Sequence, residues 1–210
     1  MKGMTVTVFG ASGKVGRLVV ERLLERGVMV RAFIRSVESI EASDGLEIFT
    51  GDIYDAVAVA EALDGADAVI STLGSWGTPK QDILTVGMTH VIAPMQAANI
   101  DRLVSLTGAE ARADGDDISL LHRVAHTAAS LAAGKILTDG ERHIELLAAS
   151  TLDWTVLRSP VMRSGTTEVY HLTEKRPAPW DTIDRAAVAK AVVDQLEDRS
   201  FIAASPYVAR

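Results

Sequence analysis

One short turn near the start of the chain constrains the fold more than any other feature. It reads Gly10-Ala11-Ser12-Gly13-Lys14-Val15-Gly16, and it joins an apolar run at Thr5–Phe9 to a helical pattern at Val15–Leu24. Glycine at position 10 turns the chain sharply, glycine at position 13 leaves the backbone bare, and glycine at position 16 lets helix and strand pack closely. This order of strand, glycine turn and helix is typical of a loop that holds the pyrophosphate of a dinucleotide at a helix N-terminus. An ordinary strand-to-helix turn is the alternative interpretation.

Apolar runs and helical patterns alternate along the whole chain. Several runs, such as Asp67–Leu73, are continuous rather than alternating, which indicates strands covered on both faces, as in a parallel sheet. We therefore predict an α/β fold, a Rossmann-type, doubly wound parallel sheet in a single domain spanning residues 1–210. The predicted strands are Thr5–Phe9, Val28–Ile34, Leu46–Thr50, Ala68–Leu73, Leu103–Thr107, Trp154–Leu157 and Phe201–Ala204. The predicted helices are Lys14–Arg26, Asp55–Leu63, Gln81–Ala98, Ile118–Ala133, Asp139–Ala149 and Arg185–Glu197.

The segment Arg163–Ile183 departs from this alternation. It contains prolines and aromatic residues with little periodicity. We predict a small substrate-facing excursion from the domain here. A plain surface excursion with short strands is the alternative.

The composition narrows the class of function. A chain of 210 residues with 48% apolar side chains can bury a sizeable core. Its net charge of −7 argues against nucleic-acid or anionic-membrane partners, because both favour basic surfaces. The absence of cysteine excludes disulfides and thiolate chemistry. Since the chain has no apolar run of about 20 residues and begins almost directly with a strand, we expect no membrane span, no signal peptide and a cytoplasmic location.

Ligands of such sheets bind at the carboxyl ends of the strands. Arg35 ends the second predicted strand, where a chain that prefers NAD(H) usually has an acidic residue. We therefore predict that Arg35 pairs with the 2′-phosphate of NADP(H), although NAD(H) is not excluded. A solvated Arg35 with Glu38 as the ribose ligand is the other interpretation. Asp52, which precedes Ile53, either accepts from the adenine amine or caps the turn before Asp55.

Two further strand ends complete the predicted cofactor site. Leu73 and Gly74 offer bare backbone to the ribose or the nicotinamide, or they simply end a strand. Thr107 ends the fifth predicted strand, and Pro160-Val161-Met162 follow the sixth. Because the carboxyl ends of parallel strands lie at one edge, we expect these residues near the nicotinamide.

These segments together resemble one superfamily. The glycine turn, Arg35-Ser36, Gly51-Asp52-Ile53 and Leu73-Gly74 are joined by the run Ser150-Thr151-Leu152-Asp153-Trp154-Thr155-Val156-Leu157-Arg158-Ser159-Pro160. They resemble the atypical short-chain dehydrogenase/reductase superfamily, in its branch of NmrA-like and flavin reductase (biliverdin reductase B)-like proteins. The resemblance implies NADP(H) or NAD(H) binding and, in many members, hydride transfer to a flavin, quinone, tetrapyrrole or carbonyl. Other members bind the nucleotide as sensors without turnover.

The catalytic pair of many short-chain dehydrogenases is missing from the sequence. Those enzymes carry Tyr-x-x-x-Lys before the sixth strand, and the corresponding positions here hold Ile136 and Gly140. Lys135 could reach a pocket. We favour a structural role for it, because Gly134-Lys135 and the following Thr138–Glu141 are typical of a helix stop and a capping box.

Two residues remain as candidates for chemistry. The resemblance implies a serine after the fifth strand and a histidine before the sixth, and Thr107 and His143 lie near these positions. Thr107 either binds the substrate or the nicotinamide amide, or only ends a strand, and His143 either donates a proton or is a core or surface residue. His122 and His126 have a spacing compatible with metal binding but no third ligand, so no metal is expected. We predict that Asp114–Asp117 is a solvated turn that caps the next helix.

The leading functional hypothesis is an NADPH-dependent oxidoreductase that reduces a flavin, a quinone or a similar planar small molecule. A delocalised acceptor can take its proton from water, so the missing side-chain acid is compatible with this reaction. A non-catalytic NADP(H)-binding sensor is the alternative. An epimerase-like nucleotide-sugar enzyme is poorly supported, because such enzymes usually need the Tyr/Lys pair and a longer C-terminal domain.

Overall fold

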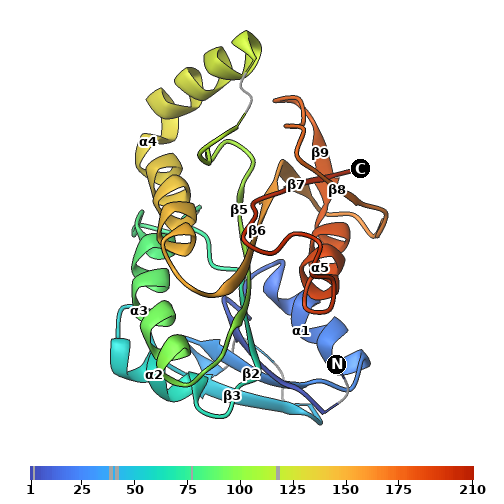
Figure 1. The fold of residues 1–210 in the computed structure, drawn as a ribbon. Helices are drawn as coiled ribbons and strands as arrows, with labels where there is room; N and C mark the ends of the chain where they lie inside the picture. The colour runs from blue at the N-terminus through green and yellow to red at the C-terminus, as the bar shows by residue number, and fades with distance from the viewer. Residues whose placement is uncertain (2, 38–39, 41–42, 77, 117–118) are drawn as a thin grey trace.

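The computed structural model describes residues 1, 3–37, 40, 43–76, 78–116 and 119–210 (Figure 1). Within these residues, an eight-stranded sheet runs through the molecule with helices on both faces. Glu38, Asp117 and Ile118, which figure in the predictions above, lie outside the described residues.

The sheet is wound outward from its middle. Its strands are β1 (Thr5–Phe9), β2 (Met29–Ile34), β3 (Leu46–Thr50), β4 (Ala68–Ser71), β5 (Arg102–Gly108), β6 (Asp153–Ser159), β8 (His171–Thr173) and β10 (Tyr207–Ala209). Their order is β3-β2-β1-β4-β5-β6-β10-β8, and every neighbouring pair is parallel except β10 and β8. The chain reverses its direction of winding between β1 and β4, so the doubly wound parallel sheet is confirmed and a ligand crevice is expected at that point.

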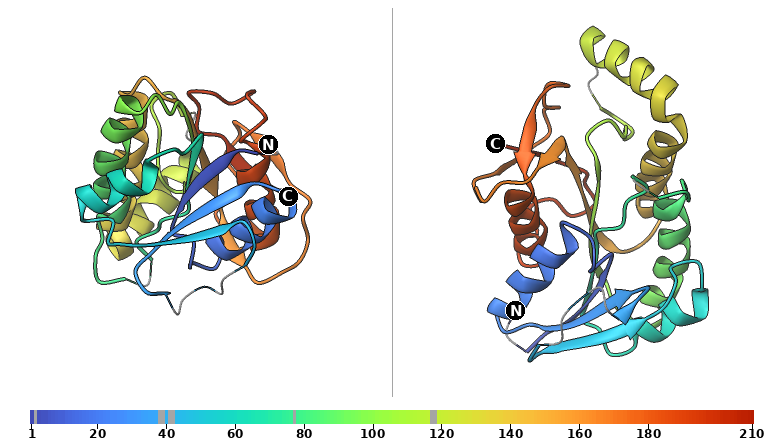
Figure 2. Two further views of the ribbon diagram at one scale, coloured as in Figure 1. Left: turned by 90° about the horizontal axis from the view of Figure 1, so that it is seen from below. Right: turned by 180° about the vertical axis from the view of Figure 1, so that it is seen from behind.

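Helices cover the two faces unequally. They are α1 (Gly16–Glu25), α2 (Ala56–Leu63), α3 (Ile83–Ala97), α4 (Leu120–Ala148) and α5 (Arg185–Asp194). Helices α1 and α5 pack together on one face, whereas α2, α3 and α4 lie side by side on the other (Figures 1 and 2). Each face has its own apolar core, and all four residues of β4 are buried. The continuous apolar runs therefore form strands covered on both faces, as predicted.

Helix α4 spans both helices predicted for this region, which meet at a kink at Ala133, where the first was predicted to end. The backbone leaves helical geometry only at Ala133, with φ −148° and ψ 37°, and the helix then continues. The predicted capping box at Thr138–Glu141 is therefore wrong, because these residues lie inside the helix. The first half of α4 projects beyond the rest of the molecule (Figure 2).

The last strand was predicted too early. Residues 201–203 form a turn in which Ala203 has φ 53°, a left-handed conformation that ends an extended segment. Ala204 makes one isolated bridge to Thr155, and the strand itself is β10.

Residues 163–183 contain short strands rather than a separate lobe. Strand β8 pairs with β10 at the edge of the main sheet, while β7 (Val161–Arg163) pairs with β9 (Thr182–Asp184) in a small second sheet. Arg163 and Asp184 form an ion pair of 2.5 Å across β7 and β9. A contact of this segment with substrate stays a prediction.

Candidate functional site

The glycine turn after β1 needs glycine at both of its ends. Gly10 has φ +78°, and a Cβ there would lie 2.8 Å from the backbone carbon of Thr72. A Cβ on Gly16 would lie 2.1 Å from the carbonyl oxygen of Gly10, which no rearrangement of a flexible side chain could relieve. These contacts pack α1 directly onto the turn, as the sequence predicted for the first and third glycines.

The middle of the turn is open to a ligand. Gly13 and Lys14 are exposed, Ser12 is half-buried, and Val15 packs into the core. Helix α1 begins here with no side-chain cap on its N–H groups and no acidic residue in its first turn. Its uncompensated positive end is suited to a phosphate group, and the bare backbone of Gly13 leaves room for one to approach.

Arg35 lies immediately beyond the carboxyl end of β2 and is exposed. No hydrogen bond or ion pair holds its side chain in the described part of the chain. Its guanidinium is therefore available to a ligand at the same edge of the sheet as the glycine turn. Pairing with a 2′-phosphate stays a prediction.

Asp52 makes local contacts at the carboxyl end of β3. Its Oδ1 accepts from the backbone N–H of Tyr54 at 3.1 Å, and its Oδ2 lies 3.5 Å from Nζ of Lys80. Lys80 also lies 3.5 Å above the Tyr54 ring. Asp55 is the N-cap of α2, as predicted, while Ile53 is buried with its carbonyl oxygen bonded to His90. The contact of Asp52 with adenine stays a prediction.

Leu73 and Gly74 follow β4, and the space around the Gly74 Cα is open. Their loop is held by Asp139 of α4, a buried residue that the sequence analysis placed in a capping box. The Asp139 carboxylate accepts from Ser75 Oγ at 2.5 Å, from Thr85 N at 2.8 Å and from Leu84 N at 3.1 Å. It therefore caps the N-terminus of α3 from another helix and fixes the residue that follows Gly74. Only the tertiary fold brings these groups together.

Thr107 is the second-last residue of β5 and lies beside α4. A Cβ on Gly140 would lie 2.7 Å from Thr107 Oγ1 and 3.0 Å from the Ala111 Cβ, so glycine at position 140 lets the helix approach the strand end. The resemblance described above assigns the lysine of the Tyr-x-x-x-Lys pair to position 140, and this assignment stays a prediction.

His143 lies in the core and is fully buried. Its Nε2 is 2.8 Å from Ser105 Oγ of β5, and its Nδ1 has no partner among the described residues. Burial lowers the pKa of His143 to about 4, although the charge of Asp139 partly opposes this shift. The ring is therefore neutral near pH 7, and its surroundings favour the core role over the proton-donor role, which stays untested.

An ion-pair network lies at the carboxyl ends of β5 and β6. Arg158 forms a two-fold contact with Asp116, at 2.5 and 2.9 Å, and lies 3.8 Å above the Tyr207 ring. Burial opposes ionisation of Asp116, but the hydrogen bonds and charge of Arg158 hold the Asp116 pKa below its usual value. The prediction that Asp116 belongs to a solvated turn that caps the next helix is therefore wrong. Ser119 caps α4 instead. The sequence contained no signal for this pairing of distant residues.

The remaining predicted residues lie around this edge. Pro160 is buried, Val161 is 69% exposed, and Met162 packs partly onto the core. His122 contacts the Pro177 carbonyl oxygen at 3.1 Å, and His126 contacts Glu141 at 3.0 Å. No cluster of three or more metal-ligating side chains occurs in the part of the chain that the structure describes. Among the same residues, no helix combines the length and the hydropathy needed to cross a membrane.

Comparison with known proteins agrees with this geometry. The profile of an NAD(P)H-binding family matches residues 10–199. The chain is 27% identical to the uncharacterized chloroplastic protein At2g37660 of Arabidopsis thaliana, over 94% of this chain and 67% of that protein. It is 31% identical to 2-alkyl-3-oxoalkanoate reductase of Stenotrophomonas maltophilia, over 63% of this chain but only 39% of that enzyme. The match covers only 18% of the length of a 3β-hydroxysteroid dehydrogenase of Mycobacterium tuberculosis.

The fold is also that of solved reductases. ChuY of Escherichia coli O157:H7, described as an anaerobillin reductase, superimposes with a TM-score of 0.81 over 98% of this chain and 97% of its own, at 24% identity. The family match includes the glycine turn and β6, and it leaves out β1 and β10. The chain belongs to this NAD(P)H-binding family, within the atypical short-chain dehydrogenase/reductase superfamily.

Proposed function

We propose that this protein is an NADPH-dependent reductase that transfers a hydride to a flavin, a quinone or a similar planar acceptor. The observation that carries the proposal is the open backbone at Gly13, which meets the uncapped N-terminus of α1 at one edge of the sheet with the free guanidinium of Arg35. Family membership supplies the nicotinamide cofactor. The phosphate preference and the acceptor are our inferences.

The residues at this edge fit the cofactor in one orientation. The turn Gly10–Gly16 would hold the pyrophosphate, Arg35 the 2′-phosphate, and Asp52 with Ile53 the adenine end. Leu73-Gly74 would contact the ribose, where the absence of a side chain leaves space. When bound, the nicotinamide supplies the hydride, that is, two electrons and one hydrogen.

The kind of acceptor follows from what the site lacks. The positions of the usual Tyr/Lys pair hold Ile136 and Gly140, and His143 is buried and neutral near pH 7. A carbonyl substrate would need a positioned acid for the oxygen that develops negative charge. A flavin or quinone spreads that charge over its rings, so the one proton that completes the reduction after hydride transfer can come from water. Thr107 and Pro160-Val161-Met162 would then orient the cofactor and acceptor rather than move a proton. The structural likeness to an anaerobillin reductase supports a reductase in general terms.

A second candidate function is an NADP(H)-binding sensor without turnover. It is favoured by the same lack of a side-chain acid. The two functions share the cofactor site and differ only in whether an acceptor is reduced.

One assay separates them. NADPH oxidation is followed at 340 nm with riboflavin, FMN and menadione as acceptors, and NADPH binding is measured by calorimetry. The proposal expects oxidation with at least one acceptor, each NADPH reducing one acceptor by two electrons with uptake of one proton. Binding without oxidation of NADPH by any of the three would replace the reductase with the sensor.

A further inference from the structure

A cavity of about 630 Å³ lies on the side of the sheet covered by α2, α3 and α4. Its wall combines the loop after β4, the first turn of α3 and the middle of α4. The polar residues that line it include Lys80, Asp82, Thr85, Lys135, Asp139 and Arg142. None of the residues proposed to hold the cofactor is among its lining residues. The cavity borders the proposed cofactor site, because Lys80 contacts Asp52 and Asp139 binds Ser75, but it does not share its lining residues.

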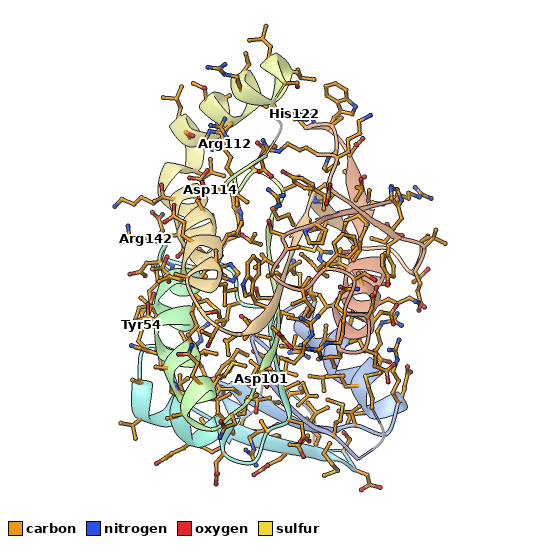
Figure 3. All side chains as sticks on the ribbon, viewed as in Figure 1. Tyr54, Asp101, Arg112, Asp114, His122 and Arg142 are labelled. Carbon is orange, nitrogen blue, oxygen red and sulfur yellow. The ribbon has the colours of Figure 1, made fainter. Side chains whose placement is uncertain are left out.

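Three cations from two elements face this space. Lys135 and Arg142 are seven residues apart on α4, which is close to two helical turns, so they lie on one face of the helix. Lys80 comes from the loop opposite and contacts Asp52 only loosely, at 3.5 Å. Within the described residues, Lys135 and Arg142 are both exposed and have no ion-pair or hydrogen-bond partner. Figure 3 places Arg142 and Tyr54 on this same side of the molecule.

The carboxylates in the wall are already engaged. Asp139 accepts three hydrogen bonds, from Ser75 Oγ and from the N–H groups of Leu84 and Thr85. Asp82 accepts the hydroxyl of Tyr54. Neither acid is paired with a lysine or arginine of the cavity. Both acids keep their negative charge, and Lys80 contacts Asp52 and the Tyr54 ring. Within the described residues, Lys135 and Arg142 are therefore the two cations of the wall that are unpaired and available to a ligand.

The first turn of α3 borders the cavity but adds little positive potential, because two acids lie at its start. Asp82 occupies its N-cap position but makes no side-chain cap bond. The helix has 15 residues, and its positive end faces the cavity. Because the Asp139 carboxylate accepts from the N–H groups of Leu84 and Thr85, it offsets the positive end of α3. Attraction for an anion therefore comes from Lys135 and Arg142.

We propose that this cavity binds the anionic group of a small molecule, a phosphate monoester or a compact carboxylate. Arg142 would donate a two-fold hydrogen bond to the anion, and Lys135 and Lys80 would supply further charge. The volume lies within the range of ordinary small-molecule sites. The same chemistry fits an acidic substituent of the acceptor or a separate small anion. Binding at this site does not depend on the proposed reductase activity.

Inorganic phosphate is the probe for the site. It is titrated into the protein at constant ionic strength, set with sodium chloride, while backbone amide shifts are followed by NMR. We expect saturable changes at residues 80–85 and 134–142. The double variant Lys135→Gln/Arg142→Gln should raise the dissociation constant for phosphate at least tenfold. The matched control, Arg123→Gln/Lys175→Gln, removes two exposed cations outside the cavity and should bind as the wild type does.

Equal affinity in the two double variants would overturn the proposal, as would shifts confined to the glycine turn at residues 10–17. Both variants remove only exposed side chains and should fold, which their melting curves would test. Where NADPH oxidation is measurable, comparison of FMN with riboflavin identifies the source of the anion. A preference for FMN that disappears in the cavity variant assigns the site to the acceptor's phosphate. If the cavity variant loses phosphate binding but keeps the wild-type preference for FMN over riboflavin, the site binds a separate anion.

Discussion

The buried imidazole of His143 makes stability depend on pH in a defined direction. The ring lies in the core between Ser105 and the rest of α4, and burial lowers its pKa from 6.5 to about 4. The unfolded chain therefore takes up a proton near pH 6.5 that the folded protein refuses until about pH 4. The stability that the folded state gains from keeping His143 neutral is fully present above pH 6.5 and is lost as the pH falls toward 4. At 1.36 kcal/mol per pKa unit, the loss amounts to about 3 kcal/mol.

Urea unfolding followed by tryptophan fluorescence, at intervals from pH 7.5 to 4.5, measures this loss. The variant His143→Gln keeps a polar group opposite Ser105 but cannot titrate, so its stability should fall less over the same interval. His171→Gln is the matched control, because His171 is exposed and its removal should leave the pH dependence unchanged. A pKa of His143 near 6.5 or above by NMR, or the same pH dependence in His143→Gln as in the wild type, would refute the reasoning. That result would also restore His143 as a candidate proton donor.

Three further substitutions test other parts of the structure. Gly16→Ala forces a methyl group against the Gly10 carbonyl and should cost about 2–3 kcal/mol, seen as a melting temperature lower by about 4–12 °C. Asp116→Asn strands the buried Arg158 charge and should cost about 3–5 kcal/mol at pH 7 in urea unfolding. In the wild type this contribution exists above pH 4 and disappears as the pH falls through the lowered pKa of Asp116. Arg35→Glu should weaken NADPH binding about 10–100-fold by calorimetry, with NADH affected much less.

Each of these substitutions has a matched control, in which the same kind of change is made at an exposed or open position. Gly74→Ala adds a methyl group into open space, Asp114→Asn removes an exposed carboxylate, and Arg123→Glu reverses an exposed charge. The free energy of unfolding of each of these three variants should stay within about 0.5 kcal/mol of the wild-type value. Arg123→Glu should also leave the ratio of NADPH to NADH affinity unchanged. If Arg35→Glu left that ratio unchanged as well, Arg35 would have no part in selecting the phosphate.

The sequence predicted the sheet well because its signals are local. The predicted strands Thr5–Phe9 and Leu46–Thr50 agree with β1 and β3 to the residue, and a capping aspartate marked the start of α2 at Asp55. The glycine turn was recognisable because a Cβ at any of its three glycines would lie close to neighbouring backbone atoms. The helix break at Ala133 was also signalled nearby, by Gly134. The sequence did not reveal that the helix would resume without a new cap.

The residues that the sequence misjudged are those whose partners lie far along the chain. Asp139 looked like part of a capping box, but it holds Ser75 and the start of α3, more than fifty residues away. Asp116 looked solvated, but it pairs with Arg158. Both carboxylates lose their water only when the helices and strands pack. No local pattern reports that loss.

The sequence by itself determined the winding of the sheet, the glycine turn and the exposed Arg35 beside it, since backbone freedom and apolar periodicity act over a few residues. The tertiary structure decided the rest. It placed His143 in the core as a neutral ring and joined Asp139 to the loop that carries Gly74. It also left Lys135 and Arg142 facing a cavity without an ion-pair partner among the described residues. These outcomes depend on burial and on contacts between distant segments, because desolvation and charge pairing exist only in the folded chain.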